Sequence, residues 1–80
     1  SLDELESICK VITNECVCIG ENDSILILVT NAKIIADLSV HILSKTLLQS
    51  RDFNIKVVDE MIRNSSGKIL YTQMEALYGS

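Results

Sequence analysis

The chain has 80 residues, which is enough for one small domain over residues 1–80 and leaves no room for a second hydrophobic core. Hydrophobic residues make up 48% of the sequence and aromatic residues 4%, a composition typical of folded α/β-type proteins and not of disordered ones. The net charge of −4 argues against a nucleic-acid surface, and no apolar run approaches the ~20 residues that span a bilayer. We therefore expect neither nucleic acid nor a membrane as a partner.

The first predicted helix begins with a capping box, in which Ser1 is the N-cap and Glu4 is the third helical residue. Its apolar residues recur at spacings of three and four up to residues 13–14. Apolar runs at residues 16–19 and 24–30 then predict two strands. Because the residues between these runs favour a chain reversal, we expect the strands to form an antiparallel hairpin. The sequence begins without Met and directly at the start of a helix, so we also expect a fragment of a longer chain.

A second amphipathic helix is predicted over residues 32–49, with Asn31 as its N-cap. A third strand should follow at residues 54–59, and a last helix should begin at Lys68 or Ile69. The strand–helix–strand connection should leave the third strand parallel to the second. We therefore expect an α+β fold of order α-β-β-α-β-α, with helices packed on a small three-stranded sheet. The long helix should bury Ile34, Ile35, Leu38, Ile42 and Leu47, and expose Lys33, Asp37, His41, Lys45 and Gln49.

The three cysteines, Cys9, Cys16 and Cys18, lie in apolar surroundings and are odd in number. A disulfide-bonded secreted domain of this size would typically have an even set, so we expect buried free thiols and a reducing, cytoplasmic compartment. A zinc site is disfavoured because Cys16 and Cys18 have no second ligand pair and His41 falls on the exposed face of a helix. No metal ligand is assigned from the sequence.

The chemistry is expected in a loop near the C-terminus, within the stretch of the chain that has a local excess of positive charge. Gly67 permits a sharp turn or a close approach to a ligand. Ser65 and Ser66 offer hydroxyl groups that can bind a ligand or cap the next helix. Lys68 is a long, flexible cation suited to a developing negative charge, and Arg63 adds a second cation. From these residue types alone, an ordinary polar loop that caps the last helix remains the alternative.

Two other interpretations of this region are disfavoured. A P-loop requires a glycine and a hydroxyl residue at the positions where this chain has Ile62 and Ile69, respectively. Asp59 and Glu60 are adjacent carboxylates, but neighbouring side chains on an extended strand point apart and do not readily share a metal ion. We expect these two residues to form a solvated strand end.

Residues 57–71, Val-Val-Asp-Glu-Met-Ile-Arg-Asn-Ser-Ser-Gly-Lys-Ile-Leu-Tyr, closely resemble the C-terminal signature of the adenylate-forming enzymes. This superfamily contains acyl- and aryl-CoA synthetases, adenylation domains of nonribosomal peptide synthetases, and luciferases. The order of the preceding elements is similar to that of the family's small, mobile C-terminal domain. The resemblance implies that Lys68 enters the active site of a large N-terminal domain. There it would stabilise negative charge as acyl-AMP forms from ATP and a carboxylic acid.

The resemblance also implies ATP with magnesium, and coenzyme A or phosphopantetheine, as cofactors of the full enzyme, with none bound by this domain alone. The implied partners are the large N-terminal adenylation domain and coenzyme A or an acyl carrier protein. Tyr71 and Thr72 stand where many members carry a basic residue, and residues 52–55 lack the proline that many members have before the third strand. The Ser-Gly-Lys form favours the CoA-ligase branch. The alternative is a stand-alone module that docks a carrier protein or a ligase without catalysis.

Overall fold

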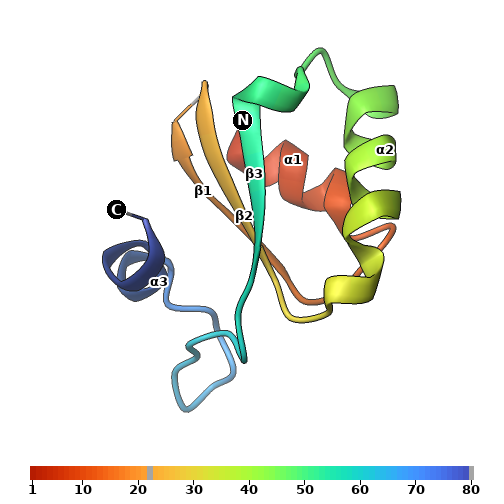
Figure 1. The fold of residues 1–80 in the computed structure, drawn as a ribbon. Helices are drawn as coiled ribbons and strands as arrows, with labels where there is room; N and C mark the ends of the chain where they lie inside the picture. Colours follow the sequence, from red (N-terminus) through yellow and green to blue (C-terminus); the bar gives the residue numbers. More distant parts are fainter. Residues whose placement is uncertain (22, 80) are drawn as a thin grey trace.

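The computed structural model describes residues 1–21 and 23–79. Within these residues, three α-helices and three strands follow one another in the predicted order, and the strands form one sheet (Figure 1). The predicted α+β fold is therefore confirmed. The elements are α1 (Leu2–Cys9), β1 (Cys16–Glu21), β2 (Ser24–Val29), α2 (Ile35–Lys45), β3 (Phe53–Val57) and α3 (Tyr71–Tyr78), with 3₁₀ turns at Ala32–Ile34 and Ser50–Asp52.

β2 lies at the centre of the sheet, between β1 and β3. β1 pairs with β2 in the antiparallel direction, with Cys16 opposite Val29, and β3 pairs with β2 in parallel, with Phe53 opposite Ile25. Both directions are as predicted. Because β2 is flanked on both sides and covered on both faces, its sequence is a nearly continuous apolar run.

The two faces of the sheet are covered by different helices (Figure 1). α1 and α2 pack on one face, whereas α3 and the segment that leads into it lie against the other. Alternate residues of β1 point to opposite faces and enter different cores. The first core consists of Leu5, Cys9, Cys16, Cys18, Ile25, Ile27, Val29, Leu38 and Ile42, and the second of Val17, Ile19, Leu28, Val58, Met61 and Met74. The single domain thus has two hydrophobic cores, one on each face of the sheet, whereas its length suggested only one.

The second helix is shorter than its hydrophobic pattern predicts. α2 ends at Lys45 instead of residue 49, because Thr46 has an extended backbone (φ −132°, ψ 173°). The hydroxyl of Thr46 donates a 2.8 Å hydrogen bond to the carbonyl of Ile42 and so occupies one of the last helical acceptors. Leu47 therefore lies beyond the helix and is fully exposed, so the prediction that it is buried is wrong.

Other boundaries also differ from those predicted. α2 begins at Ile35 instead of residue 32, because Asn31 caps the 3₁₀ turn Ala32–Ile34 that precedes it. β1 extends to Glu21 instead of residue 19. α1 ends at Cys9 rather than at residues 13–14, because residues 10–12 form turns instead of a further helical segment. β3 ends at Val57, and Asp59, which was predicted to be part of this strand, lies exposed beyond it. Within the described residues, no helix combines the length and the apolar character needed to cross a membrane.

Candidate functional site

The loop that contains Lys68 is a small β-hairpin. The amide of Leu70 donates to the carbonyl of Ile62 at 2.9 Å, and Arg63 and Ile69 form an antiparallel bridge between the two arms. This pairing holds the backbone of the second arm in an extended conformation up to Leu70. α3 consequently starts at Tyr71, and the prediction that it starts at Lys68 or Ile69 is wrong.

Asn64 organises the tip of this hairpin. Its side-chain oxygen accepts hydrogen bonds from the amides of Ser66 (2.9 Å) and Lys68 (3.0 Å). Its backbone N–H donates to the carbonyl of Lys68 at 2.9 Å, and its carbonyl accepts from the N–H of Gly67 at 3.0 Å. These four bonds fix the backbone of the tip. Sequence reasoning did not single out Asn64, although asparagine is a residue whose side chain commonly bonds to the backbone two residues further on.

Gly67 takes the conformation that only glycine adopts easily. Its φ of +84° lies in the left-handed region, and this reverses the chain between Ser66 and Lys68. Ser65 and Ser66 are exposed at the tip. They do not cap the following helix, because the N-cap position of α3 is Leu70, which makes no side-chain capping bond.

Arg63 braces the hairpin. One guanidinium nitrogen donates to the carbonyl of Gly67 at 2.9 Å, and the other donates to Oε1 of Glu15 at 2.7 Å. Glu15 immediately precedes β1, so this ion pair ties the hairpin to the body of the domain. Arg63 is therefore engaged within the domain, whereas the sequence suggested a free second cation. Glu15 was not singled out, because residue spacing gives no signal for a contact 48 positions apart.

Lys68 is exposed, and only its backbone is held by the hairpin. Among the described residues, ion pairs form at Ser1–Glu4, Lys10–Glu6 and Arg63–Glu15, and none of them involves Lys68. The hairpin thus combines a fixed Cα position with an ammonium group that can reach outward. This arrangement suits a contact with an anion held by another molecule or domain.

Apolar residues root the hairpin in the second core. Met61 is buried, and Ile62 and Ile69 pack against the same cluster. The amide of Ile62 also lies 3.2 Å from the sulfur of Met74 on α3. The base of the hairpin is therefore held between the sheet and α3, while its polar tip projects from the domain (Figure 1).

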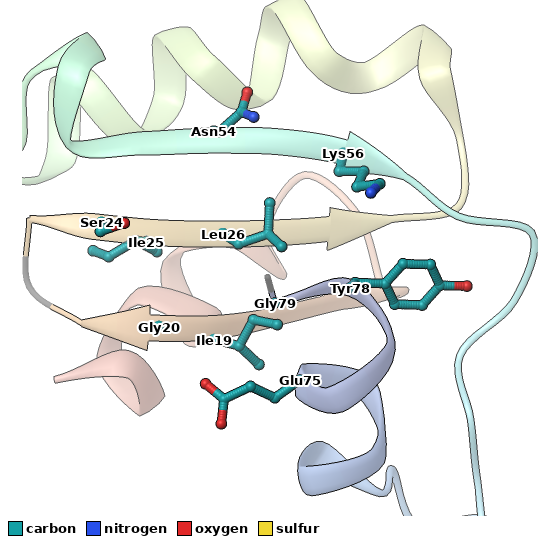
Figure 2. Close-up of a pocket in the computed structure, with 10 residues that line it drawn as sticks. All are labelled: Ile19, Gly20, Ser24, Ile25, Leu26, Asn54, Lys56, Glu75, Tyr78 and Gly79. Atoms are coloured by element: carbon teal, nitrogen blue, oxygen red, sulfur yellow. The ribbon is translucent and has the colours of Figure 1, made fainter.

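A separate hollow of about 300 Å³ opens between the sheet, where all three strands line it, and the end of α3 (Figure 2). Leu26, Asn54 and Lys56 line its sheet side, and Tyr78 lines its helix side. The ammonium of Lys56 lies 5.4 Å from the centroid of the Tyr78 ring, within the range of a cation–π interaction. Residues 63–68 take no part in this hollow, so it is distinct from the hairpin.

The three cysteines meet in the first core. Cys9, Cys16 and Cys18 are all buried as predicted, and their sulfur atoms lie within 4.8 Å of one another. His41 is half-buried and lies outside this group of ligand atoms. The residue pattern predicted a structural role for each thiol, but it did not indicate that the end of α1 brings Cys9 to the two thiols of β1.

The thiols of this cluster ionise unequally. Hydrogen bonds from Cys16 and then Cys18 lower the pKa of Cys9 to about 4, against the opposing effect of burial. The hydrogen bond from Cys18 lowers the pKa of Cys16, but the bond to Cys9 and burial outweigh it and raise that pKa to about 12. Hydrogen bonds to Cys16 and Cys9, together with burial, raise the pKa of Cys18. The hydrogen bonds within the cluster therefore favour ionisation of one thiol at the expense of the other two.

Comparisons of the chain with models of protein families, with curated proteins and with solved structures give no significant match.

Proposed function

We propose that this chain is the C-terminal domain of an ATP-dependent, AMP-forming carboxylate ligase of the acyl- or aryl-CoA synthetase type, and that it supplies Lys68 to the adenylation step. The resemblance of residues 57–71 to the signature of adenylate-forming enzymes supports the choice of family. The observation that carries the proposal is the position of Lys68, which is exposed and forms no ion pair with residues 1–21 or 23–79, on a hairpin whose arms and turn are fixed by hydrogen bonds.

In the proposed reaction, an oxygen of the substrate carboxylate attacks the α-phosphorus of ATP. Acyl-AMP forms and pyrophosphate leaves, and the thiol of coenzyme A or of a carrier protein then displaces AMP. The ammonium of Lys68 donates hydrogen bonds to oxygens of the carboxylate and the α-phosphate, where negative charge is concentrated during the attack. A single preorganised donor of this kind contributes ~10²–10³-fold to the rate.

Under this proposal, the two domains have different roles. The large N-terminal domain holds ATP, magnesium and the acid, and the small domain closes over them with its hairpin. The brace from Arg63 to Glu15 and the side-chain bonds of Asn64 reduce the freedom of the backbone that carries Lys68. Less entropy is then lost when the lysine enters the active site. The isolated chain is inactive under this proposal, and its three free thiols favour a reducing, cytoplasmic compartment.

The test combines the chain with the large adenylation domain of its own ligase and measures pyrophosphate release with a panel of carboxylic acids. We expect activity only with both parts present, and Lys68→Ala should reduce acyl-adenylate formation by ~10²–10³-fold. Lys45→Ala removes an exposed lysine from the end of α2 and serves as the matched control. Unchanged adenylation in the Lys68→Ala protein would refute the catalytic role.

The competing function is a docking module for an acidic carrier protein or for another ligase. It relies on the excess of positive charge near the C-terminus, but the charge of Arg63 is already paired with that of Glu15. Arg51 remains exposed. Capture of a carrier protein by the isolated domain, together with its loss in an Arg51→Glu variant, would favour docking over catalysis.

A further inference from the structure

Three thiols from two elements converge at one point in the first core. Cys16 and Cys18 lie two positions apart on β1, so their side chains point to the same face of the sheet. Cys9 is the last residue of α1, which packs on that face. The exposed fractions are 0% for Cys9, 0% for Cys16 and 2% for Cys18, and the sulfur atoms lie within 4.8 Å of one another.

This spacing is close to that of sulfur atoms around one metal ion. With a metal–sulfur distance of about 2.3 Å, three sulfurs in a trigonal plane lie about 4 Å apart. The sulfurs of the folded chain are therefore separated by little more than the spacing that a three-coordinate ion requires. The backbone already places them, since a helix end and a strand spacing of two set the three Cβ positions.

The surroundings select the kind of ion. Structural zinc is almost always held by four ligands, but the ligand atoms that meet here, among the described residues, are the three sulfurs alone. The burial of the cluster leaves no exposed position for a water ligand. Soft sulfur ligands select Cu(I), which is stable with three of them. The cluster packs against the apolar residues Leu5, Ile25, Ile27, Val29, Leu38 and Ile42. One buried carboxylate lies beside it, because Glu6 accepts a hydrogen bond from the N–H of Cys18.

We propose that Cys9, Cys16 and Cys18 form a binding site for a single Cu(I) ion. The site is independent of the proposed ligase function, because the Lys68 hairpin is rooted in the core on the opposite face of the sheet. The ion joins the end of α1 to β1 and stabilises the folded chain by binding it in preference to the unfolded one.

Access to the site is through the end of α1. This helix has only 8 residues and ends at Cys9, and Val11 in the turn that follows is 73% exposed. Such a terminus opens locally at a small free-energy cost, and ligands of this kind can also be loaded while the chain folds.

The test is an anaerobic titration of the reduced, full-length chain with Cu(I), in competition with a chromophoric Cu(I) chelator. We expect one Cu(I) per chain, an increase in the thermal midpoint, and an X-ray absorption spectrum with sulfur neighbours only. A parallel titration with Zn(II) should show binding weaker than that of Cu(I). The proposal fails if the chelator retains all the copper, if nitrogen or oxygen neighbours dominate the spectrum, or if zinc is preferred.

Three variants, Cys9→Ser, Cys16→Ser and Cys18→Ser, assign the ligands. Changes around a metal's ligands already cost about 10–100-fold in affinity, so removal of one sulfur should cost about 100-fold or more. Val29→Thr is the matched control, because it also introduces a hydroxyl into this core but leaves all three thiols in place. Circular dichroism checks the fold of each variant. If a variant does not fold, the X-ray absorption spectrum of the unmodified chain with Cu(I) decides whether the ligands are sulfur. Equal Cu(I) affinity in a folded serine variant and in the control would exclude that cysteine as a ligand.

Discussion

The hydroxyl of Tyr71 donates a 2.8 Å hydrogen bond to Oε1 of Glu6 and so joins α3 to α1, which lie on opposite faces of the sheet. The other carboxylate oxygen of Glu6 accepts a 2.9 Å bond from the backbone N–H of Cys18. Cys18 lies on β1, which is an edge strand of the sheet. Glu6 is only 6% exposed, so one buried carboxylate links both helical layers and caps part of the sheet edge.

Replacement of Glu6 by alanine should destabilise the domain strongly. It leaves the Cys18 amide and the Tyr71 hydroxyl without their acceptor, and loss of such bonds to a charged group should reduce the free energy of unfolding by about 2–4 kcal/mol. Glu6→Gln keeps an acceptor and should lose less. Urea denaturation followed by circular dichroism measures both values. Glu4→Ala changes an exposed acid of the same helix, and a loss as large as that of Glu6→Ala would contradict this role.

Tyr71 should ionise at an unusually high pH. Burial, followed by its hydrogen bond to Glu6 and the charge of that carboxylate, raises its pKa to about 12 from the ordinary value of about 10. The folded state thus favours the neutral phenol, so this stabilisation is complete below pH 10 and is lost as the pH rises from about 10 to about 12. Ultraviolet titration of a Tyr78→Phe variant follows Tyr71 alone, because the chain has two tyrosines. An ordinary midpoint in that variant would disprove the assignment.

The two glycines with positive φ should differ in their tolerance of a side chain. A Cβ at Gly67 meets no atom within 4 Å, so Gly67→Ala should cost only the strain of the left-handed conformation, about 1–2 kcal/mol. A Cβ at Gly20 would collide with the carbonyl oxygen of Ser24, so Gly20→Ala adds a backbone shift to the same strain. Denaturation midpoints should therefore rank the original chain above Gly67→Ala, and Gly67→Ala above Gly20→Ala. The reverse order of the two variants would show that the hairpin tip is the more constrained turn.

The ion pair between Arg63 and Glu15 should matter more for position than for stability. Both side chains are partly exposed, at 38% and 43%, so a double-mutant cycle should give a coupling of only about 0.5–1 kcal/mol. Under the proposed ligase function, Arg63→Ala should nevertheless lower the adenylation rate, though less than Lys68→Ala, because the hairpin loses its brace. Glu15→Gln should also lower the adenylation rate. An Arg63→Ala protein with full activity would show that the brace is not needed.

The end of α2 gives a direct test of burial. Leu47 is fully exposed, so Leu47→Gln should change the free energy of unfolding by less than about 0.5 kcal/mol. Leu38 on the same helix is completely buried, and Leu38→Ala should cost about 2–5 kcal/mol through lost contacts and a cavity. A large loss in the Leu47 variant would place this residue in the core after all.

The order of the elements and the directions of the strands could be predicted from the sequence, because they depend on local periodicity and on the handedness of chain connections. The alternation that places Cys16 and Cys18 on one face of the sheet and Val17 on the other is one such feature, because it follows from the two-residue period of a strand. The ends of the helices were harder to predict from the sequence. The pattern of α2 continues through Leu47, but Thr46 has an extended backbone and its hydroxyl accepts a hydrogen bond from the N–H of Leu48. This local side-chain bond takes the place of a further helical turn.

The residue types around Lys68 were sufficient to select the candidate loop, since glycine, serine and lysine there have recognisable conformational and chemical properties. Only the tertiary structure decided that Arg63 is committed to Glu15, that Tyr71 reaches Glu6, and that Cys9 joins the two thiols of β1. These pairs depend on how helices dock on the sheet. Local sequence determines each partner separately, whereas docking is fixed by the packing of the whole core, and so neither spacing nor composition reveals these contacts.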